Sequence, residues 1–295
     1  MDEFQVIVAQ GLTFGALYGL AALGFAILYH TTKVFHIAYG AIGVLGSFVA
    51  VVIYSGNDPA KLILSVAAGV LAATVVTVAV FQGPYRWLEN KGGDRLAIFV
   101  ASLGIAYSIP PLLILVFGPE IRSYSIQGLV NIREVLGFPF TSLGFIVIAV
   151  SAVSLIGLVW ALANTRWGYQ VRALASNREL SQLVGARTDV TLLGVYAVGG
   201  LCCALSATFL GMFTNITSAG GTGLALYAAV AVIAGGLQSY TGGFFLAVAL
   251  GFLQPLMSTL ISSSWATVGV FGTVLIMILL KPAGIQFRLP KVATR

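Results

Sequence analysis

Charged residues are scarce in this chain of 295 residues, and their scarcity excludes most soluble folds. Only 8% of the residues are charged and 59% are hydrophobic, with a mean hydropathy of +1.00, whereas soluble domains carry about 25% charged residues. A soluble domain of this length would need far more polar surface. Uninterrupted apolar runs of about 20 residues instead indicate membrane-spanning helices. The sequence therefore predicts an all-α polytopic membrane protein.

Cysteines and catalytic motifs are also nearly missing. Cys202 and Cys203 are the only cysteines, and because they are adjacent in an apolar run they form neither a disulfide framework nor a spaced metal motif. The chain contains no GxxxxGK[ST] sequence, so no P-loop is available to bind ATP phosphates. The HExxH and GxSxG signatures of common hydrolases are absent as well. We expect no catalytic site, metal or cofactor, and any ATP-derived energy must come from another protein.

Carboxylates are missing from the predicted spans. Carriers driven by protons usually keep carboxylates or histidines within the membrane, where these groups bind and release the coupling ion. All nine acidic residues lie instead in loops or at predicted membrane boundaries, so proton coupling is not expected. They are Asp2, Glu3, Asp58, Glu89, Asp94, Glu120, Glu134, Glu179 and Asp189.

The apolar runs predict one transmembrane domain over residues 1–295, with about nine hydrophobic segments. The segments at 37–54 and 224–237 are short and glycine-rich, and each follows a long helix. Two interrupted or re-entrant segments in matching places of two halves indicate a translocation pathway in transporters built from repeats. In the first helix, glycines every four residues predict close helix packing. The nine segments are 6–29, 37–54, 62–82, 96–117, 141–163, 189–213, 224–237, 243–261 and 265–280.

Basic residues, which give the chain its net charge of +6, are divided unequally between alternate loops. Cytoplasmic loops carry an excess of lysine and arginine. This bias places the 164–188 loop and the carboxyl terminus in the cytoplasm and the amino terminus outside, and it gives no support to nucleic-acid binding. The richer set is Lys33, Arg86, Lys91, Arg95, Arg166, Arg172, Arg178, Arg187, Lys281, Arg288, Lys291 and Arg295, and the poorer set is Lys61, Arg122 and Arg133.

The 164–188 loop contains the most polar stretch of the chain, YQVRALASNRELSQLVGARTD. Within it, Ser176 to Glu179 fits the S-x-x-E capping box and predicts a helix over about 177–184. Leu180, Leu183 and Val184 form an apolar stripe at helical spacing, and Gly185 stands where a left-handed residue ends a helix. Two interpretations are open: the stripe rests on its own domain or in the lipid interface, or it fills a groove on a partner protein.

This hairpin also carries a resemblance to a known family. The run GYQVRA, with the Asn, Leu and Gly that follow it, resembles the cytoplasmic motif of ABC-transporter permeases of the branched-chain amino acid (LivH) family. GLTFGALYGLAALGFAILYH resembles the first helix of that family, VAVIAGGLQSYTGGFFLAVALGFLQ its late glycine-rich region, and VLIMILLKPAGIQF its terminal motif. These stretches occur in the family's order and cover nearly the whole chain. One departure is that His36 and Tyr39 stand where the family's NFAHG motif has Asn and His.

The resemblance implies a type II importer-like ABC permease fold in a bacterial inner membrane. It also implies a second, paralogous permease subunit, two cytoplasmic ATPases and an external solute-binding protein. The hairpin over 166–188, with its contact region at 169–187, would form the coupling helices that meet the ATPase. The residues that would make this contact are Arg172, Ala173, Ser176, Asn177, Glu179, Leu180, Leu183 and Gly185.

The translocation pathway is assigned to polar residues beside the interrupted segments or in the first helix. His36 and Tyr39 are the main candidates, although aromatic residues at a boundary also serve as interfacial anchors. The complete set is Gln10, Thr13, His36, Tyr39, Gln238 and Ser239.

The sequence thus predicts a permease subunit of an ATP-driven importer for hydrophobic or branched-chain amino acids, or for a related small amphipathic solute. Alternating access, driven through the hairpin, would move the solute inward. A stand-alone secondary carrier or facilitator and a structural membrane subunit are the alternatives.

Overall fold

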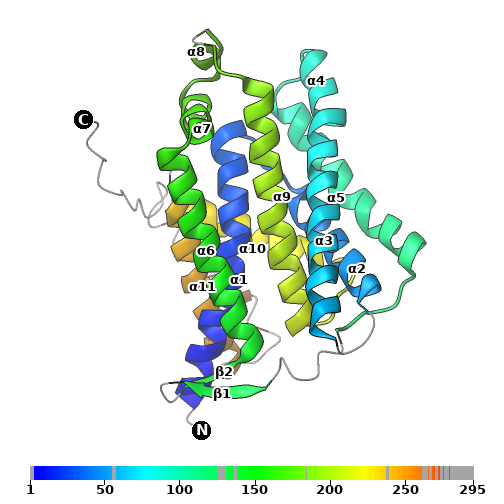
Figure 1. Cartoon of the computed structure of the whole chain (residues 1–295), viewed down its shortest axis with the longest axis vertical. Helices are drawn as coiled ribbons and strands as arrows, with labels where there is room; N and C mark the ends of the chain where they lie inside the picture. The colour runs from blue at the N-terminus through cyan, green and yellow to red at the C-terminus, as the bar shows by residue number, and fades with distance from the viewer. Residues whose placement is uncertain are drawn as a thin grey trace.

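The computed structural model describes most of the chain, and Figure 1 shows the arrangement of its helices. Gln238 and most of the ninth predicted segment lie outside the described residues. The described residues are 3–54, 58–124, 131–135, 138–183, 185–236 and 239–260, with single positions at 265, 268, 269, 272, 275 and 279.

Six helices among the described residues are long and apolar enough to cross a membrane, which confirms the prediction of a helical multi-pass fold. They are α1 (Glu3–Thr32), α3 (Pro59–Val80), α5 (Arg95–Phe117), α6 (Ser142–Asn164), α9 (Thr188–Phe213) and α11 (Tyr240–Leu260). Two shorter apolar helices are α2 (Ala38–Ile53) and α10 (Gly220–Ala234). The remaining elements are the π-helix η1 (Phe81–Tyr85), α4 (Arg86–Asn90), α7 (Arg166–Ser176), α8 (Arg178–Leu183), β1 (Ile132–Val135) and β2 (Phe138–Thr141).

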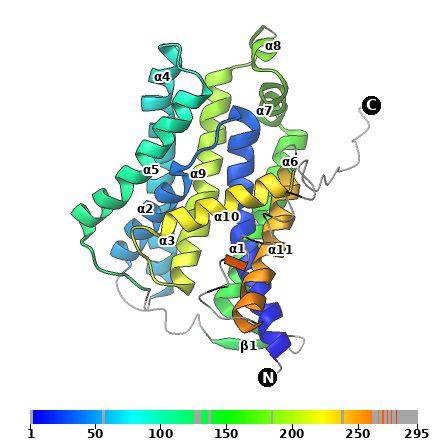
Figure 2. The ribbon, with the colours of Figure 1, turned by 180° about the vertical axis from the view of Figure 1, so that it is seen from behind.

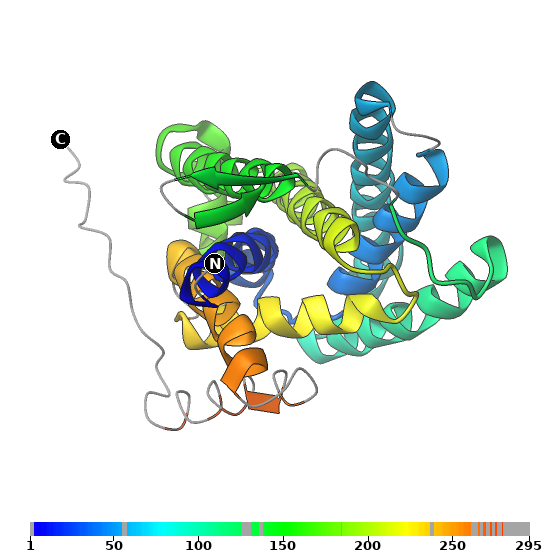
Figure 3. The ribbon, with the colours of Figure 1, turned by 90° about the horizontal axis from the view of Figure 1, so that it is seen from below.

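Helix α1 forms the centre of the bundle. Its most apolar window is 89% buried, whereas the windows of α3, α5 and α6 are only 22–28% buried and leave their outer faces free for lipid or other subunits. α1 packs against α6, α9, α10 and α11, and Figure 3 shows it surrounded by these helices in the view from the amino-terminal end. The core therefore forms around the first helix of the chain.

The glycine stripe of α1 is the contact surface for α11. A Cβ on Gly11 would lie 2.5 Å from the Phe252 ring, and one on Gly15 would lie 2.7 Å from the Val248 carbonyl oxygen. A Cβ on Gly251 would overlap the backbone of Gly15. The prediction of close helix packing is confirmed, because only glycine lets two backbones approach this closely.

The two short helices occupy corresponding places. α2 follows α1 after a non-helical stretch at 33–37, and α10 follows α9 after another at 214–219. The two helices cross near their first turns, where a Cβ on Gly40 or on Gly221 would overlap the carbonyl group of the other glycine. Figure 2 shows α10 running obliquely in front of the long helices. The prediction of two interrupted segments is thus confirmed.

The two ends of the bundle differ in charge. The end that carries α4, α7 and α8 (Figure 1) holds most of the described basic side chains, namely Lys33, Arg86, Lys91, Arg95, Arg166, Arg172, Arg178 and Arg187. The opposite end carries the amino terminus and the antiparallel pair β1–β2, in which Ile132 pairs with Thr141. This strand pair was not expected, because its strands are too short to show a clear alternation. The asymmetry agrees with the loop bias in the sequence.

Candidate functional site

The hairpin, defined here as α7, α8 and the turn ending at Gly185, begins with a capped and anchored helix. The Thr165 hydroxyl accepts a hydrogen bond from the Gly168 amide at 3.0 Å and caps α7. Val171 and Leu174 are buried against the bundle, and the Trp167 indole donates to the Thr191 carbonyl oxygen at 3.3 Å. These contacts lie on the apolar face of the amphipathic helix α7, and they attach the hairpin to the spans.

The second helix of the hairpin begins one residue later than the capping box predicts. Ser176 ends α7, and the Asn177 side chain accepts from the Leu180 amide at 3.0 Å. The assignment of Ser176 as the cap is therefore wrong. Asparagine caps a helix as well as serine does, and α7 extends through Ser176, so the extended residue that begins α8 is Asn177. The helix covers 178–183 rather than 177–184.

The turn that ends α8 follows the prediction for Gly185. Gly185 has a φ of 84°, which favours glycine. Its amide donates to the Gln182 carbonyl oxygen at 3.0 Å, and the Ala186 amide donates to the Ser181 carbonyl oxygen at 2.9 Å. These two bonds form a Schellman motif. Both ends of this short helix are therefore satisfied locally.

The cap assignment leads to a contrast between two neighbouring alanine substitutions. Asn177→Ala is expected to destabilise α8 by about 1 kcal/mol, because the Leu180 amide loses its partner. Ser176→Ala is expected to have almost no effect, since Ser176 lies in the last turn of α7. Hydrogen exchange of the Leu180 amide in detergent checks this: faster exchange in Ser176→Ala than in Asn177→Ala would contradict the assignment.

All eight residues predicted to contact an ATPase are exposed. Leu180 and Leu183, the two described members of the apolar stripe, are 60% and 82% exposed, and α8 lies beyond α7 at the tip of the molecule (Figure 1). The stripe therefore does not pack on the described part of its own chain. The exposed set is Arg172, Ala173, Ser176, Asn177, Glu179, Leu180, Leu183 and Gly185.

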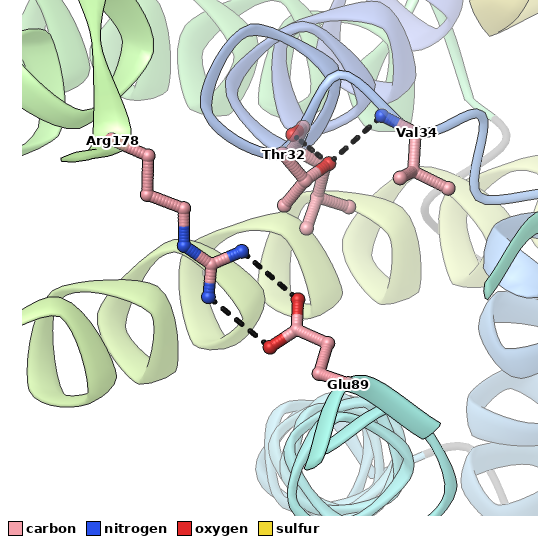
Figure 4. A network of polar contacts seen from close by, with 5 residues as sticks. Thr32, Val34, Glu89 and Arg178 are labelled. Carbon is pink, nitrogen blue, oxygen red and sulfur yellow. Dashed lines mark hydrogen bonds and ion pairs between the residues drawn. The ribbon is translucent and has the colours of Figure 1, made fainter. Parts of the chain in front are cut away.

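Two ion pairs at the same end involve α4. Arg178 of α8 donates two hydrogen bonds to Glu89 of α4, at 3.0 and 3.1 Å (Figure 4). Arg86 of α4 contacts Asp189 in the first turn of α9 at 2.6 Å. Sequence reasoning missed these four residues as a group, because each pair joins segments about 90 or 100 positions apart. One signal for this contact is present in the sequence: Glu89 and Arg178 have opposite charges and lie in loops predicted to be on the same side of the membrane.

A cavity of about 460 Å³ opens at this end, between the hairpin and the ends of the spans. Its walls combine charged side chains, including Lys33 and Arg95, with the rings of Phe81, Tyr85 and Tyr196. Glu89 and Arg178 line it as well. Among the described residues, no three His, Cys, Asp or Glu side chains form a metal site.

The predicted pathway residues do not form one site. His36 is buried, its Nδ1 lies 2.7 Å from the Tyr85 hydroxyl, and its ring also contacts Tyr196. Tyr39 is buried and donates to the Ala21 carbonyl oxygen at 2.8 Å, so neither residue is an interfacial anchor. The other described members lie apart from this pair.

Those other members have local contacts. Thr13 is buried and donates to the Ala9 carbonyl oxygen at 2.8 Å, whereas Gln10 is exposed on α1. Ser239 accepts from the Gly242 amide at 3.0 Å at the start of α11. The pathway role of the six residues stays a prediction.

The helical spans, the two interrupted helices and the exposed polar hairpin define a class, the multi-pass membrane transport permease. Residues 7–279 match the family model described as "Branched-chain amino acid transport system / permease component", and the chain belongs to this family. The resemblance found in the sequence is confirmed. As a permease subunit the chain is a non-catalytic part of a transport system.

Two relatives agree with this membership, and one solved structure has a similar fold. The chain is 25% identical to the high-affinity branched-chain amino acid transport system permease protein LivH of Escherichia coli K12, over 97% of both chains. It is 23% identical to the corresponding protein BraD of Pseudomonas aeruginosa, over 95% of both. Its fold is similar to a chain of PsaBC from Streptococcus pneumoniae in complex with Fab, with a TM-score of 0.52 and 12% identity over 94% of this chain and 92% of that one. At this identity the structural similarity concerns the fold alone.

Proposed function

We propose that this permease moves a hydrophobic or branched-chain amino acid, or a related small amphipathic solute, inward across a bacterial inner membrane. It does so with a second permease subunit, two cytoplasmic ATPases and an external solute-binding protein. The observation that carries the proposal is the capped α8, whose Leu180 and Leu183 side chains point away from the described part of the chain. A short, stiff helix with an exposed apolar pair suits docking into a groove of a partner.

The orientation belongs to the same proposal. The hairpin end carries eight described basic side chains, and Lys61 and Arg122 lie at the opposite end. Under the positive-inside rule, this difference supports a hairpin in the cytoplasm and an amino terminus outside. ATPases act in the cytoplasm, and the hairpin is then on the side where they can bind. Movement of the ATPases would displace the hairpin and reorient the helices around the passage.

Reconstitution in liposomes tests the proposal. Uptake of radiolabelled leucine is expected only when the chain is combined with its paralogous permease, the ATPases, the solute-binding protein and ATP. Isoleucine, valine and short amides would be compared as competitors, and binding to the solute-binding protein would be measured separately. Uptake by the chain alone, without ATPase, would establish a facilitator and overturn the proposal.

A further inference from the structure

Helix α8 has one polar contact with a distant element among the described residues. Its most extensive packing contacts are with α7 and α9, which flank it in the chain. Its other hydrogen bonds, from the Ser181 hydroxyl to the Arg178 carbonyl oxygen for example, are local. The paired bonds between Arg178 and Glu89 form the polar connection between α8 and α4. A bidentate arginine–carboxylate pair fixes orientation as well as distance.

We expect this ion pair to contribute little to the stability of the fold, because water reaches both side chains. The side chains of Arg178 and Glu89 are 45% and 28% exposed, and ion pairs that water can reach contribute little to folding. The two parallel hydrogen bonds nevertheless make the pair a directed contact, and hydrogen bonding to Glu89 raises the pKa of Arg178 above its usual value. Its geometry is suited to holding α8 and α4 at a fixed spacing.

Glu89 lies near the end of a long helical segment that contains a π-helical turn. α3, η1 and α4 form one continuous helical rod over 60–90, and η1 interrupts its α-helical bonding at Phe81–Tyr85 with Pro84 inside. Proline has no amide proton to donate, and π-helical turns and prolines are places where helices bend. A force on Glu89 can therefore turn α4 about η1 while α3 stays packed.

Tyr85, the last residue of η1, contacts the stretch that leads into the interrupted helix α2. Its hydroxyl lies 2.7 Å from Nδ1 of His36 in the 33–37 stretch that leads into α2. The first turn of α2 meets α10 at Gly40 and Gly221, where the two backbones are in contact. A rotation of α4 would thus move Tyr85 against the segment that sets the position of α2 relative to α10.

The cavity under the hairpin leaves room for this motion. Its volume of about 460 Å³ corresponds to on the order of 15 water molecules at roughly 30 Å³ each. Across the cavity from the ion pair, the Thr32 hydroxyl accepts from the Val34 amide at 3.2 Å and holds the turn that leaves α1 (Figure 4). α8 and α4 can shift together by expelling water, without unpacking the apolar core.

We propose that the Arg178–Glu89 ion pair is the strut that transmits movement of the coupling hairpin, through α4 and the η1 bend, to Tyr85, His36 and the head of α2. Arg178 and Glu89 are positioning residues that do not touch the solute. The inference rests on the proposed function, because it presumes that an ATPase moves the hairpin. It adds the route by which the movement reaches the interrupted helices.

A charge exchange in the complete transporter tests the strut. Glu89→Arg and Arg178→Glu, each alone, place two like charges together, whereas the double variant restores an opposite pair in reverse order. We expect ATPase co-purification to stay normal in all three. The number of solute molecules moved per ATP hydrolysed should fall at least fivefold in each single variant and return to within twofold of the wild type in the double variant. The proposed role of the ion pair is overturned if a single variant keeps the wild-type number of solute molecules moved per ATP, or if the double variant does not recover it.

A matched control uses the neighbouring ion pair. Arg86 and Asp189 join α4 to α9, which is itself a span. Arg86→Asp breaks this pair and keeps Asp189, whose charge also acts on Arg178. Transport per ATP should change less than twofold in this variant. An equal loss of coupling at this pair would show a general effect of charge and overturn the specific role of Glu89 and Arg178.

A covalent link gives a second measurement that is independent of charge. Glu89→Cys with Arg178→Cys should lose coupling when untreated and regain it when a short bis-maleimide joins the two thiols; Cys202 and Cys203 are buried and do not compete. A block of transport by the link would show that the contact must open, which overturns the strut. Failure of the proposed function is recognised separately, because the wild-type chain would then transport without ATPase or not bind one.

Discussion

The double variant Glu179→Lys with Leu183→Asp is expected to insert into the membrane normally and to lose the ATPase completely on purification. Glu179 and Leu183 are exposed on α8, and Leu183 is 82% exposed. Because neither side chain packs on the described part of the chain, the change leaves the fold intact. A charge placed at an apolar anchor in an interface typically costs several kcal/mol, since the carboxylate is buried without a partner. A loss of 4 kcal/mol corresponds to roughly a thousandfold weaker binding.

The opposite end of the molecule offers a matched control with one acidic and one large aliphatic residue. Glu120 and Ile121 lie side by side in the sequence, and Ile121 is 66% exposed. Glu120→Lys with Ile121→Asp makes equivalent chemical changes far from the hairpin. The ATPase should co-purify normally with this control. Normal co-purification with the hairpin variant, or an equal loss with the control, would show that α8 is not the docking surface.

The sequence identifies the hairpin because its signals are local. Polar composition, apolar residues at helical spacing and Gly185 all lie within about 20 residues, and each has a direct physical reason. The error at Ser176 has the same origin. Ser176 and Asn177 are both good caps, and the choice between them depends on how far α7 extends, which the packing of Val171 and Leu174 decides.

The glycine stripe and the two interrupted helices could be predicted for a similar reason, whereas their partners could not. Glycine spacing indicates that a helix will be approached closely, but it does not say by which helix. The partner of Gly15 is Gly251, more than 200 positions away, and the crossing of Gly40 with Gly221 joins the two halves of the chain. Such pairings arise from the tertiary arrangement alone.

The residues of the proposed transmission route from Arg178 and Glu89 to His36 are the hardest to predict from the sequence. Gly83-Pro84 indicates a local break in a helix, but it does not predict that Tyr85 will meet His36. The contact between Glu89 and Arg178 depends on α4 and α8 meeting at one end of the bundle. Polar residues chosen by sequence position, such as Gln10 and Thr13, therefore proved to lie apart from this network.

The largest effect on stability is expected from Gly251→Val, at the contact between α1 and α11. Any Cβ at position 251 overlaps the Gly15 backbone and lies 2.9 Å from the Gly11 carbonyl oxygen. Backbone atoms cannot swing aside as a flexible side chain can, so the two helices must separate. Overpacking of a core typically costs 1–3 kcal/mol, and the additional carbons of valine act on the most extensively buried helix of the bundle. We expect the midpoint of thermal unfolding in detergent to fall by about 10 °C, or the chain to fail to purify as a single species.

Gly157 provides the matched control for this prediction. It is an exposed glycine of the span α6, and a Cβ there would meet no atom within 4 Å. Gly157→Ala should leave the midpoint unchanged or raise it slightly, because alanine restricts the unfolded chain and favours the helix. If Gly251→Val unfolded at the same temperature as the wild type, the α1–α11 contact would be looser than the structure has it. If Gly157→Ala were as damaging as Gly251→Val, helical glycines would matter for a reason other than close approach.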